Sequence, residues 1–469
     1  MPTSIHIGCC RSTSVTMETA PGRMDTHLSP EKIPGIPPRL SHAVLVVLVL
    51  IVATFAVRFG MDMILLASKG EMRDFAACYT AAVVARAGGA FYDPQPGRPW
   101  FAENENRDLI AAARRLGTLH RHEEFEHVHI FSYPPAMMFF MLPFSFISFH
   151  VAKLIWLALS LFAMGWGMWL VGRTIHSHTL SSFCMVSLAL IFQPVRNTLE
   201  LGQVNALMFI LLAVFFALYR GGRDVPAGLV LGLSIAIRLH PAMLVLYLMW
   251  RREFRTAVVA LATAVAVTLL AVPIFGLDQS VIYFTQVAPK FARALVSVEN
   301  HSLAGFLATI GSGLGVTPAD QEVGSPWTAR IAAGLVLAMT AVLLARPVPA
   351  RRSCTADLEF ALVLVLIPLA TPNATINHLI LLLPSYWILC ERLLGEGSTG
   401  DLLVSSLAGL SAILIGVVND FYTHPLLSKG LLVFIAEIKF YGLVLLYAAI
   451  VSLLFKIRRS EGLGAPARL

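Results

Sequence analysis

The chain contains a run of apolar residues, from His42 to Leu66, that is long enough to cross a lipid bilayer. A hydrocarbon core about 30 Å thick requires roughly 20 apolar residues in a helix. Further apolar runs follow, and within them the apolar residues are nearly continuous rather than alternating with polar ones. Alternation is typical of a membrane β-barrel, whereas continuous runs predict helices. The sequence therefore predicts an all-α, polytopic integral membrane protein.

The composition supports this class. The 469 residues are 57% hydrophobic and 13% charged, whereas a soluble domain is about 45–50% apolar and about 25% charged. The formal net charge of +7 is no sign of a nucleic-acid partner, because arginines gathered in short loops between spans are ordinary in membrane proteins. We expect membrane lipids, and no nucleic acid, as partners.

We expect about twelve transmembrane helices, some of them short. The clear candidates are 42–66, 151–172, 178–195, 204–219, 257–276, 327–346, 401–418 and 430–455, and the weaker ones are 226–238, 241–250, 358–371 and 378–393. The runs 131–149, which contains Pro134, Pro135 and Pro143, and 303–316 are interpreted as re-entrant rather than spanning. An even number of spans returns both termini to one side of the membrane.

Basic residues predict which side that is. The positions expected to be cytoplasmic are Arg173, Arg220, Arg223, Arg251, Arg252, Arg255, the run 346–352, Lys456, Arg458 and Arg459. Residues 1–40 then form a disordered cytoplasmic tail, 41–456 the transmembrane domain and 457–469 a second cytoplasmic tail. The opposite face carries a large first loop, 67–132, and a second loop, 277–326. A surface helix is expected at 104–116, and the protein is predicted to lie in the inner or plasma membrane.

Asp74 stands within a few residues of the predicted lipid boundary, at the start of the stretch 71–94. A carboxylate there can act at the membrane surface on a group whose tail lies in lipid. The alternative is structural, because aspartate is also a favoured N-cap for a helix starting at Phe75.

Arg238 and His240, in the sequence IRLHP, interrupt an apolar hairpin. A cation at such a depth is costly and by default marks a site with an anionic partner, and an arginine fork suits a phosphate. The alternative for Arg238 is a structural ion pair.

Other polar residues fall on the same predicted face. Gln203 and Asn205 could bind a sugar or bridge helices, and His378 begins a late span, where a lone histidine is often simply a core residue. The end of the second loop, on the same predicted face, holds Asn300, His301 and Ser302.

The first loop contains a cluster of four histidines without a standard zinc spacing, so no metal is predicted; they are His120, His122, His127 and His129. The chain has no Walker loop, GxSxG or HExxH motif.

Six motifs in order resemble glycosyltransferase family 87, the polyprenol-phosphate-mannose-dependent mannosyltransferases with the C-type membrane fold. They are RDFAACYTAA with GGAFYDP, FSYPPAMM with LPF, LGQVNALM, AGLVLGLSIAIRLHPAML, NHSL and TPNATINHLILLLP. The similarity runs from about residue 60 to 390. It implies inverting transfer of a hexose, mannose by expectation, from a polyprenyl-phosphate donor to a lipid-linked or glycan acceptor on the extracytoplasmic face. No nucleotide sugar, metal or cofactor is implied.

The resemblance also suggests residue roles. Asp74 matches the presumed base, Arg238 stands where the family usually has Lys or Arg before Pro, and His378 matches a late histidine, although the family's aromatic residue before it is absent here. We therefore expect catalysis by Asp74 and His378, and donor phosphate binding by Arg238 and His240. The residues expected to bind the sugar or acceptor are Tyr133, Gln203, Asn205, Asn300 and Ser302.

Two alternatives stay open from the sequence. One is a C-type transferase that uses another polyprenyl-phosphate sugar, such as glucose or arabinose. The other is a non-enzymatic transporter or flippase for a lipid-linked glycan, which also needs polar groups at helix breaks. A transporter would place those groups near the bilayer midplane and show paired repeats, and no repeat is visible.

Overall fold

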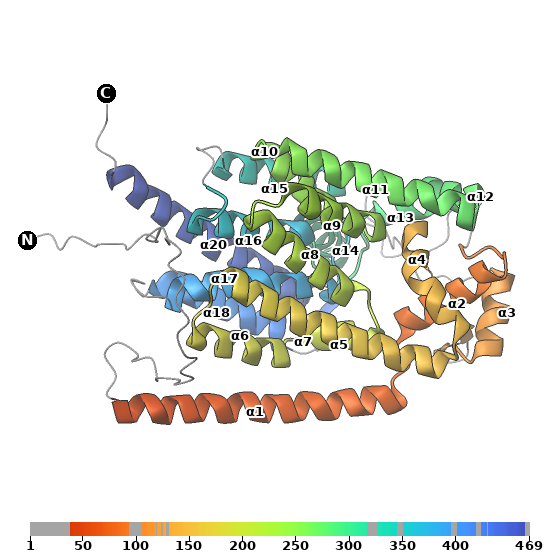
Figure 1. The fold of residues 1–469 in the computed structure, drawn as a ribbon, viewed down its shortest axis with the longest axis horizontal. Helices are drawn as coiled ribbons and strands as arrows, with labels where there is room; N and C mark the ends of the chain where they lie inside the picture. Colours follow the sequence, from red (N-terminus) through yellow and green to blue (C-terminus); the bar gives the residue numbers. More distant parts are fainter. Residues whose placement is uncertain are drawn as a thin grey trace, which may run out of the picture.

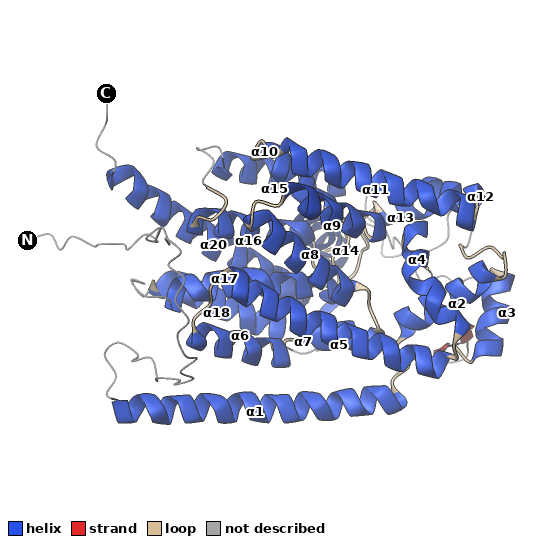
Figure 2. Ribbon diagram, viewed as in Figure 1, coloured by secondary structure: helices blue, strands red, loops and turns tan. Residues whose placement is uncertain are grey.

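The computed structural model describes residues 38–92, 106–118, 120–122, 125–127, 131–316, 326–344, 350–394, 401–418, 424–428 and 430–464. Helices dominate these ranges, as the sequence predicts (Figure 2). The exception within them is a small antiparallel hairpin of β1 (His120–His122) and β2 (Phe125–His127). The long tail 1–37 and the centre of the first loop lie outside the described residues.

The first half of the chain supplies helices α1 to α13. Their bounds are α1 Pro38–Lys69, α2 Arg73–Arg86, α3 Arg107–Leu116, α4 Met138–Met141, α5 Phe149–Thr174, α6 Thr179–Ile191, α7 Gln193–Leu201, α8 Asn205–Arg220, α9 Asp224–Ile237, α10 Ala242–Trp250, α11 Phe254–Phe275, α12 Leu277–Ile282 and α13 Ala288–Phe291. The second half supplies α14 Leu303–Gly313, α15 Pro326–Leu344, α16 Cys354–Ala370, the 3-10 helix η4 Ile376–Leu382, α17 Leu383–Leu394, α18 Leu402–Gly416, α19 Val433–Ala436 and α20 Ile438–Gly464.

The long helices run roughly side by side and form a bundle (Figure 1). Within it α9 packs on α11, α5 on α8, and α18 on α20. Both described ends of the chain lie at one end of the bundle, whereas α2, α3, α4 and α12 gather at the other. Helix α1 lies along the outside, where its side chains are mostly exposed.

The prediction of about twelve full spans is not confirmed. In the described ranges, four stretches are long and apolar enough to cross a membrane: Val49–Arg86, Phe149–Thr174, Phe254–Phe275 and Ile438–Arg459. Helices α6 and α7, bent by 47° at Phe192, could together form a fifth. Every predicted apolar segment does contain helix, but the remaining helices are shorter. Such short helices are tolerated in a membrane where neighbouring protein covers their ends.

The proline-rich run 131–149 is broken, as expected, into three short helices. These are η1 (Pro135–Met137), α4 and η2 (Leu142–Phe146). Proline lacks a backbone N–H and restricts the residue before it, and Pro135 and Pro143 lie in the first turns of η1 and η2. The run 303–316 contains α14, which has 11 residues. The helices of 131–149 cover only Pro135–Phe146, so neither run contains a helix long enough to span, and their re-entrant course stays a prediction.

The predicted surface helix is present as α3. Asn106 caps it, since its side chain accepts hydrogen bonds from the backbone N–H groups of Asp108, at 3.0 Å, and Leu109, at 3.2 Å. The helix packs on α2, and its buried residues are Leu109, Ala112 and Ala113.

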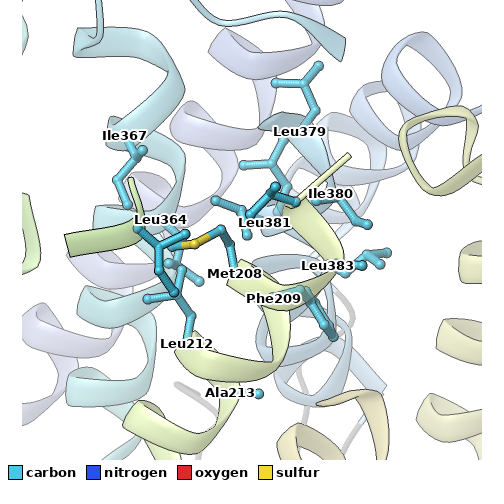
Figure 3. Packing of buried hydrophobic residues seen from close by; sticks show 14 of the residues in the cluster. Met208, Phe209, Leu212, Ala213, Leu364, Ile367, Leu379, Ile380, Leu381 and Leu383 are labelled. Carbon is cyan, nitrogen blue, oxygen red and sulfur yellow. The ribbon is translucent and has the colours of Figure 1, made fainter. Parts of the chain in front are cut away.

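The bundle core lies between α8, α16 and the η4–α17 segment. Figure 3 shows Met208 and Leu212 of α8 beside Leu364 of α16 and Leu381 of η4, with Phe209 on the side of Leu383. Close packing of this kind, rather than expulsion of water, holds helices together within lipid. It fixes α8 and η4 relative to each other, and both of these elements supply polar residues to the same end of the bundle.

Gly202 allows α2 to approach the junction between α7 and α8. Its φ of +67° is in the left-handed region, and a Cβ atom there would lie 2.6 Å from Cβ of Phe75 and 2.9 Å from Cε of Met72. The Gly202 carbonyl also accepts a hydrogen bond from Nε1 of Trp156 at 2.9 Å. Contact between α2 and this junction therefore requires glycine at position 202.

We expect Gly202→Ala to lower thermal stability more than Gly222→Ala does. Gly222 has a similar φ of +76°, but a Cβ atom there would meet nothing within 4 Å, so alanine adds only backbone strain, about 1–2 kcal/mol. At Gly202 the new methyl group must also displace α2. Melting temperatures of the two purified variants in the same detergent provide the measurement. Equal losses would show that α2 does not depend on this contact.

Candidate active site

Seven of the nine predicted site residues lie in one connected cluster. They come from the first turn of α2, the loop before η1, the α7–α8 junction, the break between α9 and α10, and η4. The members are Asp74, Tyr133, Gln203, Asn205, Arg238, His240 and His378. The chain thus brings together residues up to 304 positions apart (378 − 74).

Asp74 does not cap α2, so the structural alternative for this residue is wrong. The helix begins at Arg73, its N-cap is Met72, and no side chain caps it. The half-buried Asp74 carboxylate instead accepts a hydrogen bond, on Oδ2, from Nε2 of Gln203. Within the described ranges its Oδ1 atom has no hydrogen-bond partner.

Tyr133 and Gln203 connect Asp74 to the rest of the cluster. The Tyr133 hydroxyl donates to Oε1 of Gln203 at 3.0 Å, which fixes the amide so that Nε2 faces Asp74. Tyr133 is itself held because its carbonyl accepts a hydrogen bond from the hydroxyl of Tyr92 at 2.6 Å. The ring of Tyr133 lies 5.3 Å from the guanidinium carbon of Arg238, within the range of a cation–π contact.

Arg238 stands at the C-terminus of α9, where the chain is extended, with φ −155° and ψ 131°. The half-buried guanidinium donates through Nη1 to Oδ1 of Asn205, and its Nη2 lies 2.7 Å from Nε2 of His378. Neither partner is an anion. The break before Pro241 therefore places a cation among uncharged acceptors and an aromatic ring.

No carboxylate in the described part of the chain forms an ion pair with Arg238. The arginines at the opposite end of the bundle differ. Arg220 pairs with Asp357 at 2.9 Å, and Arg251 and Arg458 pair with Glu359, each at 2.8 Å. Arg238 has no such short ion pair within the described residues, although its charge acts on the nearby carboxylate of Asp74, and the structural alternative for Arg238 stays open.

His378 lies between Arg238 and Thr375. Arginine can only donate, so Nε2 of His378 accepts from Arg238. Nδ1 accepts from the backbone N–H of Thr375 at 3.0 Å and lies 3.1 Å from the hydroxyl and 3.3 Å from the carbonyl oxygen of the same residue. The ring of His240 meets that of His378 edge-on, with centroids 4.8 Å apart. Since its acceptor nitrogen is occupied, His378 is placed to orient Arg238.

Asn300 and Ser302 lie in a second cluster, which closes the loop before His378. The Asn300 side chain donates to the carbonyls of Leu295, at 3.1 Å, and Pro372, at 3.0 Å, and accepts from the N–H of Ala374 at 3.0 Å. Ser302 caps α14 by accepting from the N–H of Gly305 at 2.9 Å. Their predicted role in binding sugar stays untested, and these contacts assign them to positioning the loop.

Asn373 belongs to the same second cluster and was not singled out from the sequence. Its Oδ1 accepts from the N–H of Leu295 at 2.8 Å, and its Nδ2 donates to the carbonyls of Phe291, at 2.9 Å, and Arg293, at 2.7 Å. The only signal for it was its place among the polar residues of TPNATINH. The segment 371–375 is therefore tied to the second loop immediately before the site.

The side chains of the histidine cluster in the first loop lie outside the described residues, as do Glu123 and Glu124. Among the residues that are described, no group of three or more His, Cys, Asp or Glu side chains could hold a metal ion.

Comparison with known proteins finds relatives among two kinds of glycosyltransferase. A polyprenol-phosphate-mannose-dependent alpha-(1-2)-phosphatidylinositol mannoside mannosyltransferase of Mycolicibacterium smegmatis is 35% identical over 132 residues, which cover 28% of this chain and 29% of the relative. A protein of the same name from Mycobacterium tuberculosis is 27% identical over 298 residues, covering 60% and 66%. An alpha-(1->3)-arabinofuranosyltransferase of M. smegmatis is 28% identical over 167 residues, covering 34% and 39%.

These alignments span less than two thirds of each relative, so the relatives' activities are not transferred directly to this chain. The model of glycosyltransferase family 87 matches residues 131–372, slightly more than half of the chain. Tyr133, Gln203, Asn205 and Arg238 fall inside the matched region, whereas Asp74 and His378 fall outside it. The resemblance seen in the motifs is confirmed, and the chain belongs to glycosyltransferase family 87.

Proposed function

We propose that this protein transfers mannose from a polyprenyl-phosphate donor to a lipid-linked or glycan acceptor on the extracytoplasmic face of the cell membrane, with inversion at the anomeric carbon. The observation that carries the proposal is the cation of Arg238, which has no carboxylate partner among the described residues and lies in a cluster with the open carboxylate oxygen of Asp74. Family membership and the donor named for the mannosyltransferase relatives support it.

Arg238 is suited to bind the donor phosphate. Arginine has five N–H donors, and two are engaged by Asn205 and His378, so three remain. A phosphate forms charge-assisted bonds roughly twice as strong as those to neutral acceptors. Charge grows on the leaving phosphate as the bond to the sugar breaks, and a cation already in position stabilises that charge most effectively. Asn205, His378 and Tyr133 hold the guanidinium in place for this role.

Asp74 is suited to act as the base. One carboxylate oxygen is held by Gln203, and the other is open to an acceptor hydroxyl. In the proposed step the acceptor oxygen bonds to the anomeric carbon while the carbon–oxygen bond to phosphate breaks. The hydroxyl proton passes to Asp74, and the bonding electrons pass to the phosphate beside Arg238. The transition state resembles an oxocarbenium ion, as in other glycosyl transfers.

The position of the cluster fits an extracytoplasmic site. Helix α2, which carries Asp74, lies at the end of the bundle opposite the described ends of the chain (Figure 1). The positive-inside rule places those ends, with Lys456, Arg458 and Arg459, in the cytoplasm. A flippase would instead concentrate polar groups near the bilayer midplane. Family membership also favours the transferase.

Asp74→Asn is expected to lower the transfer rate by about 10²–10⁴-fold, the usual contribution of a general base. Asparagine keeps the shape of the side chain but cannot take the proton. Donor binding should change little, because the base acts on the acceptor. The measurement is single-turnover transfer and donor affinity in purified protein, with Asp108→Asn, the same change in the first turn of α3, as the control. Near-normal transfer by Asp74→Asn would exclude Asp74 as the base.

Arg238→Ala is expected to weaken donor binding by about tenfold to a hundredfold, because a hydrogen-bonded charge contributes about 1.5–3 kcal/mol. Arg238→Lys should retain part of the affinity, since lysine supplies the charge without the planar fork. Binding of polyprenyl-phosphate mannose, compared with the neutral polyprenol, separates phosphate recognition from recognition of the lipid tail. Unchanged preference for the phosphorylated lipid in Arg238→Ala would remove the proposed phosphate role.

A second candidate sugar is arabinose, because one relative is named as an arabinofuranosyltransferase. Membranes containing the protein can be supplied with radiolabelled polyprenyl-phosphate mannose, glucose or arabinose in parallel. We expect label from mannose to enter an acceptor, and Asp74→Asn membranes to provide the background. If arabinose or glucose were incorporated selectively, that sugar would take the place of mannose in the proposal. The proposal that the protein is a transferase would stand.

A further inference from the structure

A buried lysine at the junction of α1 and α2 has a charge that the described residues do not balance. Lys153, in the second turn of α5, has a relative exposure of 6%. Its Nζ donates one hydrogen bond, to the carbonyl of Gly70 at 3.0 Å, and no carboxylate of the described residues lies within ion-pair distance. Lysine is almost never fully buried unless it is paired.

A second buried lysine shows how the fold stabilises such a group when no ligand is involved. Lys439, at the start of α20, donates to Oε1 of Gln193, to the carbonyl of Ile415 at 2.8 Å and to that of Val418 at 2.6 Å. Its three N–H donors are thus all used by the protein. Lys153 has one of its three donors used, so two remain.

The position of Lys153 matches the depth of lipid phosphates. The apolar helix α1 ends at Lys69, and Gly70 follows it directly. The end of an apolar span marks the boundary between hydrocarbon and head groups. The exposed Lys69 and Arg73 add positive charge at this boundary, and the nearby Glu71 is bonded to Nε of Arg73 at 3.2 Å.

We propose that Lys153 binds the phosphate of a phospholipid acceptor. This inference rests on the proposed function, in which the donor phosphate belongs to Arg238. Gly70 and Asp74 are four residues apart, so they are separated by at most about 14 Å along an extended chain. A phospholipid whose phosphate meets Lys153 can therefore present a hydroxyl of its sugar-bearing head group to Asp74. The two cations would select two lipid phosphates on either side of one base.

The competing explanation is that Lys153 only caps the C-terminus of α1. Lysine side chains do bond the last carbonyls of helices. A cap accounts for the bond to Gly70 and predicts a loss of stability when Lys153 is removed. It predicts no preference between lipids with and without a phosphate, and the test uses this difference.

The test is native mass spectrometry of the purified full-length chain with phosphatidylinositol or with diacylglycerol bearing the same acyl chains. We expect the unmodified protein to retain phosphatidylinositol at least about tenfold better, because a hydrogen bond to a charged group contributes that much. Lys153→Met should lose this preference, and Lys153→Arg should keep most of it. Lys456→Met, which removes an exposed lysine from the other end of the chain, should keep all of it.

Two outcomes would overturn the proposal. One is an unmodified protein that shows no preference for the phosphorylated lipid, a result that does not depend on how any variant folds. The other is an unchanged preference in Lys153→Met. Transfer assays provide a second measurement. We expect Lys153→Met to raise the KM of a phosphatidylinositol-based acceptor but not the KM of an alkyl mannoside. Absence of transfer to every acceptor would contradict the proposed function, while the binding experiment would still decide the role of Lys153.

Discussion

The arrangement of the site depends on how the guanidinium of Arg238 is held. An arginine in a membrane helix bundle is costly, by about 2.5–3.5 kcal/mol at the centre of a span on insertion scales. Here it is held by Asn205, His378 and the ring of Tyr133, none of which carries a compensating charge. A cation held in this way is by default a site for an anionic partner. In the proposed mechanism the bundle fixes the position of the cation, and the donor phosphate supplies the neutralising charge.

The backbone around Arg238 explains why so many polar groups meet there. The helix α9 ends at Ile237 and α10 starts at Ala242, η4 follows Pro372, and α8 follows the left-handed Gly202. Each interruption leaves backbone groups that need partners, and each places side chains at a helix end rather than on a lipid-facing side. Because these ends lie together, residues from distant parts of the chain form one cluster with continuous hydrogen bonds from Tyr92 through Tyr133 and Gln203 to Asp74.

The sequence predicted the helices and most of the cluster, because apolar runs and isolated polar residues within them are local signals. It could not predict which hydrogen-bonding groups are already satisfied. Asn300 and Ser302 look like candidate ligands for a sugar, yet their bonds go to the backbone of Leu295, Pro372, Ala374 and Gly305. Asp74 looked equally suited to cap a helix starting at Phe75, but the helix begins two residues earlier, at Arg73. The predicted number of spans is not confirmed, because many of the described apolar helices are shorter than a bilayer requires.

Lys153 is a residue whose burial and hydrogen bonding the sequence could not predict. In the sequence it is an ordinary cation near the start of a span, where lysine side chains commonly extend to the interface. Only the fold shows that it is buried, and only comparison with Lys439 shows that burial alone does not make a ligand site. Lys439 has three acceptors from the protein and Lys153 has one. Arg238 differs from the arginines paired with Asp357 and Glu359 in the charge of its partners, because neither Asn205 nor His378 is a carboxylate. In both cases the incompletely paired group lies near the end of the bundle where we expect the lipid head groups. In the proposed mechanism a transferase acting on two lipids uses one such group for each phosphate, and Asp74 takes the proton of the acceptor hydroxyl.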